Sequence, residues 1–174
     1  MKFTKIIIAL GLGLSLASAA QAKDEGHGTV HFTGSIIDAP CSITPESSDQ
    51  TIPMGQVSNL ALKDGGRSEP VKFGIELTQC DTTTLKSVAV TFTGTPSAAD
   101  ADLLAITGSA SGASIALVTA NNTPVALGTA TDAQTIIDGE NTLEFGAFLQ
   151  GDGASATIVP GAFTSTVNFT LAYE

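Results

Sequence analysis

Apolar and polar residues alternate along much of this chain, and the alternation restricts the fold more than any other feature of the sequence. Val71, Phe73, Ile75 and Leu77 are separated by single polar or small residues. Successive side chains of a β-strand point to opposite faces, so a period of two indicates a strand with one buried and one solvent-facing side. An amphipathic helix would need apolar residues every three or four positions. The pattern therefore predicts β-structure.

The same pattern recurs elsewhere, with turn residues between the repeats. It predicts strands over residues 88–92 and 143–149, with weaker candidates at 103–107, 114–119 and 125–128. Gly65-Gly66 and Asp138-Gly139 are typical of the turns between such strands. No repeat, Pro-rich linker or block of charge divides the chain. We expect one all-β domain, an antiparallel β-sandwich.

The first 22 residues have the composition of a secretory signal peptide. Two lysines precede an apolar run from Ile6 to Ala17, and Ala20-Gln21-Ala22 forms a small-x-small cleavage site. The run is shorter than the roughly 20 residues that a membrane-spanning helix needs. We expect residues 1–22 to be cleaved and the remaining chain to leave the cytoplasm.

The chain has two cysteines, Cys41 and Cys80. An oxidising compartment favours a disulfide between them. Such a bond would close a loop of about 40 residues and stabilise the fold by roughly 4 kcal/mol in the chain-entropy model. The alternative is a pair of buried free thiols.

Several classes of function are disfavoured. The formal net charge of −10 repels nucleic acids. His27 and His31 would lie about 13 Å apart on an extended segment, too far to share a metal ion. The glycine-rich run at residues 151–156 matches a dinucleotide fingerprint, but no helix follows to face a phosphate. We expect no catalytic residue, no metal site, no cofactor and no nucleic-acid partner.

The two ends of the exported chain carry its longest alternating segments. Near the N-terminus Gly28, Val30 and Phe32 share one face. Near the C-terminus one face holds Gly161, Phe163, Ser165, Val167, Phe169, Leu171 and Tyr173. Terminal strands fray unless they are paired. Either each pairs within its own domain, or one is donated to another molecule and completes its sheet.

In this order, the features resemble those of the pilin subunits of the chaperone-usher pathway, specifically the major subunits of type 1-like fimbriae. The resemblance covers the whole precursor. It rests on the signal peptide, the segment 28–34, Ala39-Pro40-Cys41, Cys80, the segment 143–151, Pro160-Gly161 and a C-terminal strand with Tyr173 as penultimate residue. Residues 34–43 and 61–68 look most like the major subunit of mannose-resistant, Proteus-like fimbriae.

The resemblance implies an incomplete immunoglobulin-like β-sandwich, which lacks its last strand and leaves a groove beside the C-terminal strand. A periplasmic chaperone would recognise the strand that contains Gly161, Phe163, Val167, Phe169, Leu171 and Tyr173. An outer-membrane usher would then exchange the chaperone for the N-terminal extension of the next subunit. That extension would be residues 23–35, with Gly28, Val30 and Phe32 facing the groove, and the pilin domain would be residues 36–174.

The function implied is that of a non-catalytic structural subunit of an adhesive fimbria. It would be exported through the periplasm to the cell surface, and its partners would be identical or homologous pilins, the chaperone, the usher and a host-surface receptor. One alternative is a secreted carbohydrate- or receptor-binding β-sandwich, such as an adhesin-like minor subunit. Sugar sites tend to use aromatic platforms, however, and this chain has no Trp and one Tyr. A second alternative is a complete secreted sandwich that does not polymerise.

Overall fold

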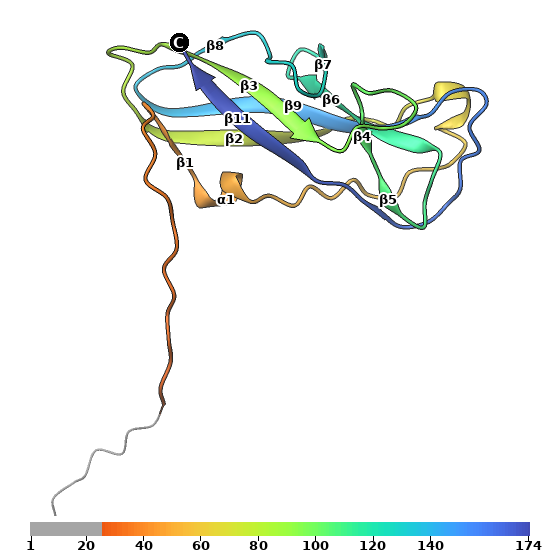
Figure 1. Ribbon diagram of the computed structural model, residues 1–174, viewed down its shortest axis with the longest axis horizontal. Helices are drawn as coiled ribbons and strands as arrows, with labels where there is room; N and C mark the ends of the chain where they lie inside the picture. Colours follow the sequence, from red (N-terminus) through yellow and green to blue (C-terminus); the bar gives the residue numbers. More distant parts are fainter. Residues whose placement is uncertain (1–25) are drawn as a thin grey trace, which may run out of the picture. The chain divides into compact units, whose positions relative to one another are not determined.

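The computed structural model describes residues 26–174, so the predicted signal peptide lies outside the described residues. The chain forms two units, one up to Ile36 and one from Ile37 to Glu174. Residues 26–36 adopt neither helix nor strand. The second unit contains every helix and strand of the described range (Figure 1).

The second unit is built almost entirely of strands, as predicted, and all of its strand pairs are antiparallel. None of its helices is long and apolar enough to cross a membrane. In chain order the elements are β1 (Ser42–Ile43), α1 (Pro45–Ser48), the 3-10 helix η1 (Lys63–Gly65), β2 (Val71–Cys80), β3 (Ser87–Gly94), β4 (Leu104–Ala105), β5 (Thr107–Gly108), β6 (Ala113–Thr119), β7 (Pro124–Val125), β8 (Gln134–Thr135), β9 (Gly139–Gly151), β10 (Phe163–Thr164) and β11 (Val167–Tyr173).

The strands form two main sheets. One has the order β1-β2-β9-β6-β4, with β7 also pairing β6, and the other has the order β11-β3-β8. The short strands β10 and β5 form a separate pair. Figure 1 shows β11 and β3 crossing over β2 and β9, which is the layered arrangement of a β-sandwich.

Aromatic side chains join the two sheets at the centre of the core. Phe92 of β3 meets Phe145 of β9 edge to face, with ring centroids 5.0 Å apart. Phe73 of β2 lies 5.8 Å from Phe145 and 6.3 Å from Phe92. Phe92 and Phe145 are each 1% exposed and belong to the buried core, whereas Phe73 is only partly buried. Such edge-on pairs stabilise by about 0.5–1.5 kcal/mol beyond the area that they bury.

The strong strand predictions are confirmed, with two differences in detail. The predicted strand 143–149 belongs to the longer β9, whose alternation is imperfect because both of its faces are covered: Phe145 enters the main core, and Phe148 joins a second cluster with Ala116 and Val118. Along the C-terminal segment the half-buried positions continue from Phe163 to Tyr173 as predicted.

A single C-terminal strand from residue 161 onward, however, was a wrong expectation. The strand is interrupted between β10 and β11, because β10 pairs with β5 whereas β11 pairs with β3. At the break the Ser165 hydroxyl donates to the carbonyl oxygen of Ala105 at 2.7 Å. Gly161 lies outside both strands and is exposed.

Candidate functional site

Strand β11 is paired along one side only. It pairs with β3 over its whole length, from Val167 opposite Gly94 to Tyr173 opposite Val88. No strand among residues 26–174 pairs with its other edge. A row of main-chain donors and acceptors is therefore available along this edge, in the form that an added strand recognises.

The inward face of β11 carries a row of apolar side chains that the fold only half covers. Val167, Phe169, Leu171 and Tyr173 are each partly buried and pack against the main core, and the residues between them are exposed. The hydroxyl oxygen of Tyr173 is buried without a hydrogen-bond partner in the described structure. Burial raises the pKa of this phenol above its ordinary value.

A second extended segment, residues 51–57, follows α1 as a coil that belongs to no helix or strand (Figure 1). Ile52, Met54 and Val57 are half-buried, and Met54 and Val57 pack against the main core. No backbone hydrogen bond among the described residues joins this segment to another part of the chain. Two segments that pack against the main core, the outer edge of β11 and residues 51–57, therefore lack a strand partner among the described residues, and we refer to these two segments together as the groove.

A cavity of about 400 Å³ adjoins the groove at residues 55–57. Val57 from one edge lines it together with Phe163, Ile158 and Ile106. Gly161 also lines this cavity, where a Cβ atom would clash with the backbone and side chain of Ser109. The cavity has room for a large apolar side chain from an occupant of the groove.

The described part of the N-terminal unit, residues 26–36, forms no strand and exposes its large apolar side chains to solvent. Val30 is 73% exposed, Phe32 is 92% exposed and Ile36 is fully exposed. A Cβ atom at Gly28 would meet nothing within 4 Å. The proposed roles of Gly28, Val30 and Phe32 as a donor strand therefore stay predictions, which the described structure leaves open.

The first residues of the second unit are attached to the end of β2, and we call this attachment the joint. A disulfide joins Cys41 to Cys80, as predicted, and both cysteines are buried. Just beyond it the Asp81 N–H donates to the carbonyl oxygen of Pro40 at 3.0 Å. The bond between the cysteines and this backbone hydrogen bond fix residues 40–41 to the end of β2.

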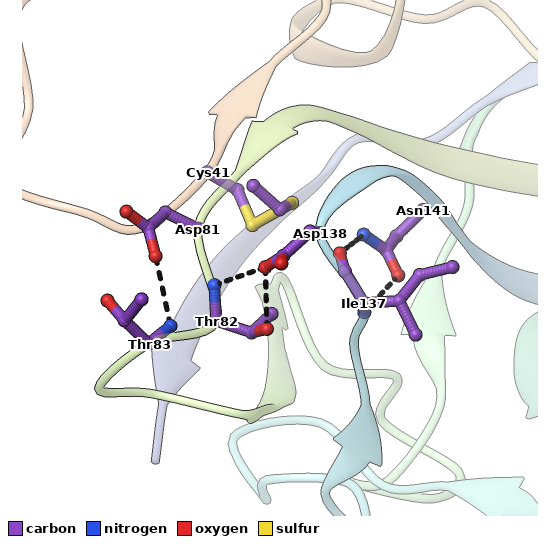
Figure 2. Close-up of a disulfide and its surroundings, with 8 residues drawn as sticks. Cys41, Asp81, Thr82, Thr83, Ile137, Asp138 and Asn141 are labelled. Carbon is purple, nitrogen blue, oxygen red and sulfur yellow. Dashed lines mark hydrogen bonds between the residues drawn. A yellow bond between two sulfur atoms is a disulfide. The ribbon is translucent and has the colours of Figure 1, made fainter.

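Two aspartates extend the joint to neighbouring loops (Figure 2). The Asp138 carboxylate accepts hydrogen bonds from the hydroxyl of Thr82 at 2.6 Å and from its N–H at 2.8 Å. These bonds lower the pKa of Asp138, because they favour its charged form. Hydrogen bonds from the hydroxyl and N–H of Thr83 lower the pKa of Asp81 in the same way.

The structure brings most of the predicted strand residues together and adds others. Val167, Phe169, Leu171 and Tyr173 lie in one row on β11, whereas the predicted Gly161 and Phe163 line the cavity. Residues 51–57 were not predicted as part of the site. The alternation of Ile52 and Met54 was a signal for them, but Pro53 and Gly55 between these residues made it weak.

Within residues 26–174 no three His, Cys, Asp or Glu side chains gather where they could hold a metal ion. Apolar side chains and backbone groups along two strand edges suit the binding of an extended peptide.

Comparison with known proteins agrees with this geometry. The family model described as "Fimbrial protein" matches residues 30–174. The Fimbria A protein of Serratia marcescens is 61% identical over 174 residues, which cover 100% of both chains. The major MR/P fimbria protein of Proteus mirabilis is 49% identical over 176 residues, again covering 100% of both.

Solved structures show the same relationship. A subunit from the structure of a chaperone-usher pilus, solved to explain rod uncoiling, has a TM-score of 0.77 and 36% identity, covering 89% of this chain and 100% of that one. The P pilus rod subunit PapA has a TM-score of 0.70 and 35% identity, covering 78% of this chain and 100% of that one. The incomplete immunoglobulin-like sandwich, the open edge of β11 and these relatives agree, and the chain belongs to the fimbrial protein family as a major structural subunit of a fimbrial shaft.

Proposed function

We propose that copies of this chain join head to tail, with residues 23–35 of one copy lying as a strand in the groove of the next. The open edge of β11, with its row of half-buried apolar side chains, is the observation that carries this proposal. An added strand would pair with the unpaired backbone and cover the apolar row at once. Contacts of this kind do not close on themselves, so their repetition produces a filament.

The exposed side chains of the N-terminal unit supply suitable anchors. Val30 and Phe32 are 73% and 92% exposed, and burying such side chains stabilises by roughly 1.5–3 kcal/mol each. Gly28 would lie where the groove is shallow and has no room for a side chain. A few anchors and a row of main-chain hydrogen bonds together make a durable joint.

The groove also needs an occupant before assembly, because an open apolar edge promotes aggregation. A periplasmic chaperone that contributes a strand would fill it, and an outer-membrane usher would exchange that strand for the next subunit. Residues 1–22 would direct the chain to this route and be removed. The fibre would stand on the cell surface and contribute to adhesion to a host-surface receptor.

Replacing one anchor tests the proposal. Phe32→Asp places a charge in the apolar groove, so we expect the variant to fold with its chaperone but to form no SDS-resistant ladder of polymers. Thr33→Asp is the matched control, because it adds the same charge one residue away on the opposite face and should leave the ladder intact. Gly28→Leu should resemble Phe32→Asp, since a large side chain would clash with the groove.

Deleting residues 23–35 separates the two halves of the proposal. The shortened chain should still bind the chaperone, since its groove is unchanged, and should fail to extend a fibre. Normal ladders from Phe32→Asp and from the deletion would show that another segment joins the copies.

A further inference from the structure

The face of the β9–β6 pair that points away from the main core carries a second apolar cluster. Ala116 and Val118 are 5% exposed and Phe148 is 6% exposed, and the partly buried Leu103 packs against them. Above this cluster lies a cavity of about 460 Å³. We call this cavity the lateral groove, since it lies on a different sheet from β11.

An arginine lies at one side of the lateral groove. Residues 66–68 run beside the end of β9, where the Ser68 N–H donates to Leu149 at 2.9 Å and the Gly151 N–H donates to Gly66 at 2.9 Å. This pairing holds Arg67 opposite Gln150. The Arg67 guanidinium carbon lies 5.4 Å from the centre of the Phe148 ring, which is within the range of a cation–π contact. The Arg67 guanidinium therefore lies over the Phe148 ring, at the edge of the lateral groove.

Two carboxylates lie at the other side. The loop before β4 contains Asp100 and Asp102, and β4 pairs with β6 on the side away from β9. The loop is held by the Asp102 N–H, which donates to the Asp100 carboxylate at 3.0 Å, and by the Leu127 N–H, which donates to the Asp102 carbonyl at 3.3 Å. The sheet thus separates an exposed cation from two exposed carboxylates, and the apolar floor lies between them.

The charges of the whole chain bear on which partner the lateral groove suits. The formal net charge is −10, so copies packed in a fibre repel one another. The basic residues of the described range are Lys63, Arg67, Lys72 and Lys86, and none of them forms an ion pair there. Carboxylates are abundant on any second copy, and Arg67 is the cation that stands beside a cavity with an apolar floor.

We propose that the lateral groove is a contact surface between copies of this chain, in which the Arg67 guanidinium of one copy meets the carboxylate of Asp100 or Asp102 of another. Arginine suits this role, because its planar group binds carboxylates in a bidentate manner and its stem packs on apolar surface. The high local concentration of copies in a fibre allows a weak contact to form. This contact is additional to donor-strand exchange. It rests on the proposed function in one respect, because it requires that the copies assemble into a fibre.

A zero-length cross-link tests the contact directly. Arg67→Lys keeps the charge and supplies an amine that carbodiimide can couple to a nearby carboxylate. Fibres are assembled from equal amounts of ¹⁴N- and ¹⁵N-labelled variant, cross-linked and analysed by mass spectrometry. We expect peptides of mixed label that join position 67 to Asp100 or Asp102, and these can come only from two copies.

Removing the carboxylates provides the control. Asp100→Asn with Asp102→Asn in the Arg67→Lys chain should abolish the mixed-label cross-links between position 67 and residues 100 and 102, because carbodiimide activates a carboxylate and not the carboxamide of Asn. Asp132→Asn, which neutralises an exposed aspartate outside the lateral groove, should leave the yield unchanged. The SDS-resistant ladder should be the same in all variants, since it reports donor-strand exchange separately.

Two results would overturn the proposal. One is an intact ladder with no mixed-label cross-link at position 67. The other is binding of glycine betaine to the wild-type chain, abolished by Arg67→Glu, in fibres that show no such cross-link. That result would make the lateral groove a site for a small zwitterion rather than for a second copy.

Discussion

At the scale of single residues, the joint around Cys41 depends on a few short hydrogen bonds. Asp138 receives two from Thr82. The Asp81 N–H donates to the Pro40 carbonyl, and the Asp81 carboxylate accepts from Thr83. Each aspartate thereby links one loop to the disulfide (Figure 2). Their exposed positions mean that the bonds are useful for geometry more than for stability.

The pKa of Asp138 leads to a pH-dependent prediction. Because the pKa is lower in the folded chain than in the unfolded one, the bonds to Thr82 contribute stability above the usual range of aspartate, and the contribution is lost as pH falls through the folded pKa. Asp138→Asn should therefore reduce the loss of stability between pH 7 and about pH 3. Urea midpoints at both pH values measure it.

Asp132→Asn is the control for this change, because the Asp132 carboxylate receives no hydrogen bond in the described range. It should leave the pH dependence as in the wild-type chain. An equal pH dependence for Asp138→Asn and the wild type would mean that Thr82 does not hold the carboxylate in solution.

At the scale of elements, side chains of α1 and its flanks complete the edge of β2. After the two residue pairs with β1, the Thr44 N–H donates to the Glu76 carbonyl at 3.1 Å, and the Ser47 hydroxyl accepts from the Glu76 N–H at 2.9 Å. The Gln50 amide then donates to the Gly74 carbonyl at 2.8 Å. This edge is closed by side chains, whereas the edge of β11 is left open.

Ser47→Ala should therefore destabilise the chain. Ser47 is 4% exposed, and its loss leaves the Glu76 N–H without an acceptor, which costs about 1–3 kcal/mol. Ser48→Ala, in the same short helix but exposed, should cost less than about 0.5 kcal/mol. Urea unfolding of both variants measures the difference. Equal stability of the two would show that water replaces the Ser47 hydroxyl.

At the scale of the whole molecule, the disulfide ties the start of the second unit to the end of β2 across 39 residues. Closing a loop of that length restricts the unfolded chain and stabilises by about 4 kcal/mol. The double variant Cys41→Ser, Cys80→Ser should lose about this much free energy of unfolding, measured by urea denaturation. Dithiothreitol should destabilise the wild type by a similar amount and leave the variant unchanged. A loss of unfolding free energy below about 1 kcal/mol would show that the disulfide contributes little to the stability of the fold.

The fold could be predicted wherever one face of a strand is buried and the other is not. Val71 to Leu77 and Val88 to Phe92 obey this rule, and both lie in the strands that the alternation predicts. Residues 143–149 obey it less well, because Phe148 is buried on the outer face by contacts with β6. A pattern of neighbouring residues does not show which side chains a distant segment of the chain will bury.

The candidate site could be predicted in part for the same reason. The half-buried residues between Phe163 and Tyr173 recur with period two, and the alternation of the sequence predicted them. The break at Ser165, the second edge at residues 51–57 and the cavity between them were not visible. They depend on which distant strand lies opposite, namely β5 for one part and β3 for the other.

The order of residues thus determined by itself that this chain forms strands and that both ends carry apolar rows, since these properties depend on neighbours along the chain. The pairing of Cys41 with Cys80 followed from a count, because an exported chain with two cysteines has one possible internal disulfide. Only the tertiary structure decided that one edge of β11 stays unpaired and that Arg67 stands across a cavity from Asp100. Both depend on the order of strands in the sheets, which long-range packing selects and which adjacent residues do not encode.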